Sequence, residues 1–239
     1  MKETKGPFDI KSSEKENCLY VHDIEEKCVW KVTQEADDQH KITKWLSTEY
    51  LPFTLSVSSG GQLLVVGRRT STLLIYRSDA ELLRLVQLPA DIKYPLHAVE
   101  TSFGNYIILH FSRPTGTDDI DGSWSRGRTD QEMVWVVTEL ARDGEIVIRR
   151  FISSNETQEM KYPGYLSLDS DDRVFLTDIR NGFVILLDND LKWNRILCPS
   201  KEEKIEARIR KARQLCYDEE KRQLLVAIVG DIVKIYTLS

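Results

Sequence analysis

The feature that most constrains the fold is a series of short apolar runs, each at a fixed distance after a proline. Pro7, Pro52, Pro95 and Pro163 precede such runs by 11 or 12 residues, and Arg213 replaces proline in a fifth copy with the same 11-residue spacing. The runs begin at residues 19, 63, 106, 174 and 224. Repeats of about 40–50 residues that contain several strands are typical of β-propeller blades.

Each copy contains further alternating apolar and polar segments, which is the pattern of half-buried strands. Turn residues separate these segments, as at Asp143-Gly144, a favoured hairpin turn. The sequence therefore predicts an all-β fold, a single β-propeller domain over residues 1–239 with five recognisable four-stranded blades. The predicted blades span residues 7–51, 52–94, 95–162, 163–212 and 213–239. A β-sandwich is the alternative arrangement of such strands.

The fifth copy ends after its third predicted strand, so its outer edge needs one more strand. Met1 to Gly6 is the only candidate within the chain, and this segment is polar and lysine-rich. Two arrangements stay open: a loosely closed five-bladed ring, or part of a six-bladed ring whose further blade lies outside this sequence.

Composition restricts the functions to be considered. The 33 basic and 38 acidic residues give a net charge of −5, which disfavours DNA binding. No apolar run reaches the length of a membrane helix, and the first residues do not resemble a signal peptide. The four cysteines form no Cys-x-x-Cys pair, and Cys18 and Cys28 are expected to be buried thiols. We therefore expect a cytoplasmic protein without a cofactor, a metal or a membrane partner.

Two copies, residues 19–32 and 174–186, show an apolar strand, an aspartate, a short polar turn and a second apolar strand. This pattern resembles NHL-type repeats, which belong to the six-bladed TolB-like propellers that also include gluconolactonase relatives. The resemblance implies that Asp23 and Asp178 stabilise strand-end turns by accepting backbone hydrogen bonds. The aspartate is replaced in the other three copies by Gly67, His110 and Ile228.

Two insertions interrupt the repeat. Residues 113–132 are rich in Gly, Asp, Ser and Arg, which predicts a long hairpin loop that projects from the scaffold. Its candidate partner-binding residues are Trp124, Arg126 and Arg128. Residues 200–213 are predicted to form one or two helical turns, and they carry the basic candidates Arg208, Arg210 and Lys211.

No nucleophile elbow, phosphate-binding loop or zinc-protease sequence occurs, and no catalytic or metal-binding residue is assigned. The preferred function is a non-catalytic protein-interaction scaffold of the NHL-like type. RNA binding is the first alternative, carried by basic pairs such as Arg149-Arg150, and a metal-dependent lactonase-type hydrolase is the second. The partner's identity and the oligomeric state stay open.

Overall fold

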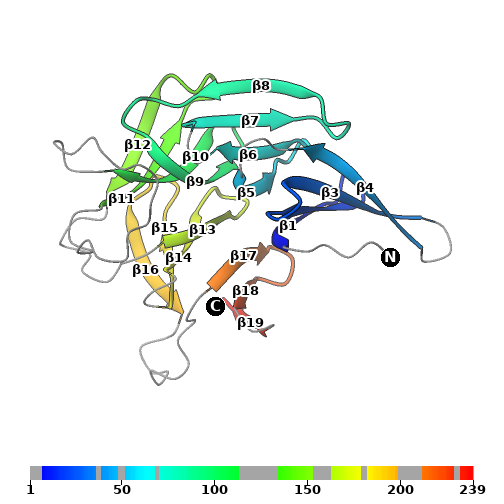
Figure 1. Cartoon of the computed structure of the whole chain (residues 1–239). Coiled ribbons are helices and arrows are strands. Elements are labelled where there is room, and N and C mark those ends of the chain that lie inside the picture. The colour runs from blue at the N-terminus through cyan, green and yellow to red at the C-terminus, as the bar shows by residue number, and fades with distance from the viewer. Residues whose placement is uncertain are drawn as a thin grey trace, which may run out of the picture.

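The computed structural model describes residues 7–35, 39–47, 52–67, 70–112, 134–152, 163–178, 182–198, 212–228 and 232–238. These residues form five antiparallel sheets in chain order around a common centre, and they contain no helix (Figure 1). The predicted five-bladed β-propeller is therefore confirmed. The described part of the chain contains no helix long and apolar enough to cross a membrane.

Within each sheet the strands are arranged in chain order, with the first strand at the centre of the ring and the last strand at its outside. The first sheet contains β1 (Pro7–Ser13), β2 (Cys18–Asp23), β3 (Cys28–Gln34) and β4 (His40–Ser47). The second contains β5 (Pro52–Val57), β6 (Leu63–Gly67), β7 (Thr72–Tyr76) and β8 (Leu82–Gln87). The third contains β9 (Lys93–Glu100), β10 (Tyr106–Ser112), β11 (Val134–Leu140) and β12 (Val147–Ile152). The fourth contains β13 (Pro163–Leu168), β14 (Val174–Asp178), β15 (Phe183–Leu187) and β16 (Trp193–Cys198). The fifth contains β17 (Ala212–Asp218), β18 (Gln223–Ile228) and β19 (Ile232–Thr237).

The turn between the first and second strand has the same geometry in all five blades. In every blade, the residue two positions before the apolar run of the second strand has a positive φ, between 44° and 79°. Only two of the five are glycine, and the full set is Asn17, Gly61, Gly104, Asp172 and Arg222. A left-handed residue after a type I turn is a common hairpin connection. The repeated turn therefore sets the same register in each blade.

Gly144 is required at its turn for two reasons. Its φ is +82°, and a Cβ atom built on it would lie 1.9 Å from Cγ1 of Val86 in the preceding blade. The turn between β11 and β12 thus packs directly on β8.

Apolar faces of successive sheets pack on each other. Four buried clusters lie between blades 1 and 2, 2 and 3, 3 and 4, and 4 and 5. Strands β6 and β14 are buried along their whole length, on both faces. The alternating pattern predicted half-buried strands, but a second strand inside a propeller lies between two neighbouring blades.

Two strands begin slightly before the predicted blade boundaries. β9 begins at Lys93 instead of Pro95, because Lys93 pairs with Phe111 across a register shift. Tyr94 has a φ of 51°, the irregular conformation that such a shift requires. β17 begins at Ala212, one residue before Arg213.

Candidate functional site

The innermost strand of each blade carries a side chain with a polar group at one equivalent position. Strand registers place Asp9, Thr54, His97, Tyr165 and Gln214 at this position of β1, β5, β9, β13 and β17. We refer to these five residues as the inner belt. Four of them are buried and Gln214 is half-buried. Buried polar groups at a ring centre are the first place to look for chemistry.

Asp9 connects three blades. Its Oδ2 accepts a hydrogen bond of 2.7 Å from Leu55 N in β5, and its Oδ1 accepts one of 2.6 Å from Gln214 Nε2 in β17. Ile10 N also donates to Oδ1 at 2.9 Å, and Lys11 Nζ lies 3.7 Å away. Burial raises the pKa of Asp9, and Lys11 and the three donors counteract that shift. The Asp9 carboxylate therefore connects β1 to β5 and β17 by hydrogen bonds.

His97 uses both ring nitrogens in contacts between blades. Leu166 N in β13 donates to Nδ1 at 2.9 Å, so the ring hydrogen lies on Nε2, which is 3.3 Å from Leu55 O in β5. Burial lowers the pKa of His97 to about 3, and nearby Lys11 adds to this effect. The neutral ring has no nitrogen left over for proton transfer or metal binding.

Hydroxyl groups complete the connections. Thr54 Oγ1 donates to Leu96 O at 2.5 Å, and the Ser56 hydroxyl donates to Ala98 O. Ser167 Oγ accepts from Tyr217 N at 3.3 Å. Together with Asp9 and His97, these bonds link blade 5 to 1, 1 to 2, 2 to 3, 3 to 4 and 4 to 5. The inner belt and its neighbours are thus used to hold the ring together.

The junction between blade 5 and blade 1 differs from the other four. Among the described residues, no buried apolar cluster joins these two blades, although Gln214 and Asp9 bond across the junction at the inner strands. In Figure 1 the first sheet is blue and the fifth is orange to red, and β1 and β17 are the inner strands that meet there. We refer to the two sheet faces on either side as the open junction.

Blade 5 presents an apolar face to the open junction. Cross-strand pairing places Cys216, Leu225 and Ile235 in one row, and Ala227 and Val233 in the next. Val233 is 57% exposed and Ile235 is 58% exposed. In blade 4 the equivalent positions of Val233 and Ile235 are Val184 and Leu186, which are buried against blade 5.

Blade 1 turns toward the open junction the face that packs on the preceding blade in blades 2 to 5. On its free face Ile10, Leu19, Val21, Val32 and Ile42 are exposed or half-buried, whereas Trp30 and Cys28 on the same face are buried. The equivalent residues of blade 4, such as Leu166, Val174 and Leu176, are buried against blade 3. The open junction therefore has apolar surface on both sides.

The edge of β19 adds backbone groups to this surface. In each of the first four blades the third strand pairs with a fourth strand, whereas the described residues of blade 5 end at β19. Edge strands with apolar side chains are prone to pair with another strand. The open junction thus combines an apolar face with a strand edge.

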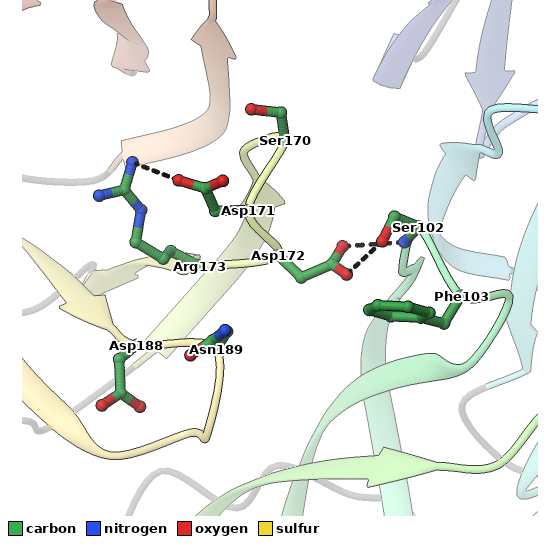
Figure 2. Close-up of a pocket in the computed structure, with 8 residues that line it drawn as sticks. All are labelled: Ser102, Phe103, Ser170, Asp171, Asp172, Arg173, Asp188 and Asn189. Atoms are coloured by element: carbon green, nitrogen blue, oxygen red, sulfur yellow. Dashed lines mark hydrogen bonds and ion pairs between the residues drawn. The ribbon is translucent and has the colours of Figure 1, made fainter.

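A hollow of about 430 Å³ lies at the loops of blades 3 and 4 (Figure 2). Asp172 points across it, and its carboxylate accepts hydrogen bonds from Ser102 N at 2.8 Å and from Ser102 Oγ at 2.6 Å. Arg173 pairs with Asp169 at 2.6 Å and lies 3.6 Å from Asp171. These contacts tie neighbouring turns together and leave Phe103, 84% exposed, as the apolar group of the hollow.

The candidate partner-binding residues of both insertions lie outside the described residues: Trp124, Arg126, Arg128, Arg208, Arg210 and Lys211. The repeat aspartates are described and buried. Asp23 Oδ1 accepts a hydrogen bond of 3.0 Å from Glu26 N in its strand-end turn. The backbone carbonyl of Asp178 accepts one of 2.8 Å from Gly182 N.

Arg149 and Arg150, one of the basic pairs behind the RNA alternative, are engaged within the protein. Arg149 pairs with Glu139 at 2.9 Å and with Asp190 at 2.5 Å, and Arg150 pairs with Asp91 at 2.5 Å. Within the described ranges, no three His, Cys, Asp or Glu side chains are grouped so that they could hold a metal ion.

Comparison with known proteins supports the fold at low sequence identity. No model of a known protein family matches the sequence, and no curated protein matches it. Virginiamycin B lyase from Staphylococcus aureus is similar in structure, with a TM-score of 0.56 and 11% identity over 99% of this chain and 71% of that chain. A streptogramin B lyase gives 0.56 and 14% over 98% and 70%, and a Lactobacillus plantarum protein gives 0.62 and 11% over 98% and 67%. At this identity the likeness shows a β-propeller and carries no activity over to this chain.

Sequence reasoning did not identify the inner belt or the open junction. A signal for the inner belt was present, because its residues lie two positions after the repeated proline in four copies, and one position after Arg213 in the fifth. The open junction had a weaker signal, the missing fourth strand of the fifth copy. Which face of that copy would be exposed depends on how the blades pack.

Proposed function

We propose that this protein is a non-catalytic interaction scaffold of the NHL-like propeller type, and that it binds a protein partner at the open junction. The observation that carries the proposal is the contrast in burial at equivalent positions. Val233 and Ile235 are more than half exposed, whereas Val184 and Leu186 are buried against the next blade. A contiguous exposed apolar face on a soluble protein is typical of a protein interaction site.

The use of the inner belt supports a non-catalytic role. A general base needs a free lone pair and a pKa near the working pH. His97 has both nitrogens in contacts with backbone groups, and burial lowers its pKa to about 3. Asp9 accepts three hydrogen bonds from neighbouring strands. These groups stabilise the ring instead of facing a substrate.

Affinity capture from a lysate of the source organism tests the proposal. The bait is the full chain, compared with the double variant Val233→Glu, Ile235→Glu. The matched control is Leu85→Glu, Ile152→Glu, because both control residues are 54% exposed but lie on β8 and β12. We expect proteins that bind the wild type and the control, resist nuclease treatment, and are lost with the β19 variant.

Two results contradict the proposal. Capture that is the same for all three baits would show that the open junction is not the binding surface. Partners that disappear on nuclease treatment would favour the RNA alternative. Circular dichroism and urea unfolding of both variants establish that they fold equally well.

A further inference from the structure

The fourth strands of the four complete blades share a sequence pattern. Each contains an apolar residue, any residue, a lysine or arginine, any residue, and a second apolar residue. The four segments are Ile42–Leu46, Leu82–Val86, Val147–Phe151 and Trp193–Leu197, with Lys44, Arg84, Arg149 and Arg195 at the centre.

The last apolar position packs the fourth strand onto the ring, whereas the first is half-buried at Ile42 and Val147 and exposed at Leu82 and Trp193. The first apolar residue pairs with the end of the third strand, as in Ile42 with Val32 and Val147 with Leu140. The last one joins the cluster shared with the next blade, as Val86 and Phe151 do. An extended segment with this pattern therefore completes a blade and covers its apolar face.

In blades 2 and 3 the basic residue of the fourth strand reaches the next blade. Arg84 donates to Tyr106 Oη at 2.9 Å and to the carbonyl of Arg142, which lies in the turn of blade 3. Arg149 donates to Asn189 O at 2.6 Å in the turn of blade 4. In blade 1 the neighbouring Trp45 makes the equivalent contact, from Nε1 to Ser78 O at 2.7 Å.

β19 offers the same receptor surface without a fourth strand among the described residues. Val233 is equivalent to Val29, Leu73, Val137 and Val184, which pair with residues at the C-terminal end of the fourth strand. Tyr236 is equivalent to Val32, Tyr76, Leu140 and Leu187, which pair with its first apolar residue. Both positions of β19 are apolar or aromatic, as the pairing requires.

We propose that the outer edge of β19 binds an extended segment of a partner protein with the pattern apolar-x-Lys/Arg-x-apolar. The segment adds antiparallel to β19 as the fourth strand of blade 5, a mode known as β-augmentation. This inference rests on the proposed function and specifies the chemistry of the partner.

Two occupants from this chain are less suitable. Residues 1–6, MKETKG, lack the pattern. β19 itself, Ile232 to Tyr236, has it, but antiparallel pairing of two copies about Lys234 would place like charges opposite each other. Lysine on an edge strand is a common means of preventing such self-pairing.

A fluorescein-labelled peptide with the sequence of residues 190–197, DLKWNRIL, is the probe, because it carries the pattern of β16. Fluorescence anisotropy measures its binding to the full chain. Control peptides carry Trp193→Ser with Leu197→Ser, or backbone N-methyl groups that prevent strand pairing. We expect saturable binding to the wild type and to Leu85→Glu, Ile152→Glu, and binding weaker by at least about tenfold for the control peptides and for Val233→Glu, Ile235→Glu.

Three results overturn the inference. The first is no binding to the full chain or to a chain lacking residues 1–6. The second is binding only after residues 1–6 are removed, which would mean that the chain's own segment covers β19. The third is a dimer of the wild type in sedimentation experiments. In this outcome the Val233→Glu, Ile235→Glu variant is a monomer, and adding the peptide does not dissociate the wild-type dimer. If partner capture still depends on Val233 and Ile235 while the peptide fails to bind, the scaffold function stands and the strand-addition mode is wrong.

Discussion

The junction between blades 4 and 5 and the junction between blades 5 and 1 are built from the same repeat positions but differ in burial. Val184 and Leu186 lie inside the first junction, with Phe175 and Tyr217 stacked at a centroid distance of 4.7 Å. Their equivalents Val233 and Ile235 are more than half exposed at the second. The difference teaches that local sequence sets which face is apolar, whereas the neighbouring blade decides whether that face is buried.

The largest expected effect comes from truncating equivalent residues at the two junctions. Leu186→Ala removes a buried side chain and should lower the free energy of unfolding by about 2–5 kcal/mol. Ile235→Ala removes an exposed side chain and should change it by less than about 0.5 kcal/mol. Urea unfolding followed by circular dichroism measures both. Equal losses would mean that Ile235 is buried in solution and that the open junction is closed.

Variants at Asp9 and Gln214 compare the stability contributed by the hydrogen bond across the open junction with that contributed by the bond between blades 1 and 2. Asp9→Ala leaves Leu55 N without its acceptor, which should cost about 1–3 kcal/mol for that buried donor. Gln214→Ala removes only the bond to blade 5 and should cost less, about 0.5–1.5 kcal/mol. The same urea titration separates the two. A loss for Gln214→Ala as large as for Asp9→Ala would show that the bond across the open junction dominates ring stability.

The buried histidines predict a loss of stability in acid. Burial lowers the pKa of His97 to about 3 and of His22 and His110 to about 4, from an ordinary value of 6.5. Between these values the unfolded chain binds protons that the folded chain does not, so stability should fall as the pH falls below 6.5. The slope is about 1.4 kcal/mol per pH unit for each histidine.

His97→Gln should reduce this slope, because it removes one of the buried histidines. The raised pKa of Asp9 acts in the opposite direction, since it lowers stability as the pH rises above the ordinary aspartate value. Unfolding curves of the wild type and of His97→Gln between pH 4.5 and 7 provide the measurement. An unchanged slope in His97→Gln would mean that His97 is not held neutral by burial.

The smallest effect concerns thiol accessibility on the two sides of the comparison. Cys216 is exposed on the free face of blade 5, whereas Cys18 and Cys28 are buried in blade 1. Cys216 should react with maleimide in the folded protein, and Cys18 and Cys28 only after unfolding. Partial desolvation raises the pKa of the Cys216 thiol, so Cys216 should react more slowly at neutral pH than a small thiol in solution. Peptide mapping by mass spectrometry identifies the labelled sites, and protection of Cys216 in the folded chain would contradict the open junction.

Much of the fold was present in the sequence because propeller strands are specified locally. The spacing from Pro52 to the run at residue 63 contains one strand, one turn and the start of the next strand, and each is fixed by short-range patterning. The same turn conformation at Asn17, Gly61 and Asp172 shows how a repeated spacing becomes a repeated register. The five blades and their order could therefore be predicted from the sequence.

The roles of the inner-strand residues depended on tertiary structure. Asp9 and His97 could have been catalytic or structural by sequence, and contacts with Leu55, Leu166 and Gln214, distant in sequence, decide that they hold strands together. In the same way, β6 and β19 are both apolar strands in sequence, but only β6 packs against a buried apolar cluster on each face, and Val233 and Ile235 of β19 stay exposed. The sequence alone determined the repeating unit, because strand and turn preferences act over a few residues. The tertiary structure decided burial, protonation and the open junction, because these depend on which blades become neighbours in the ring.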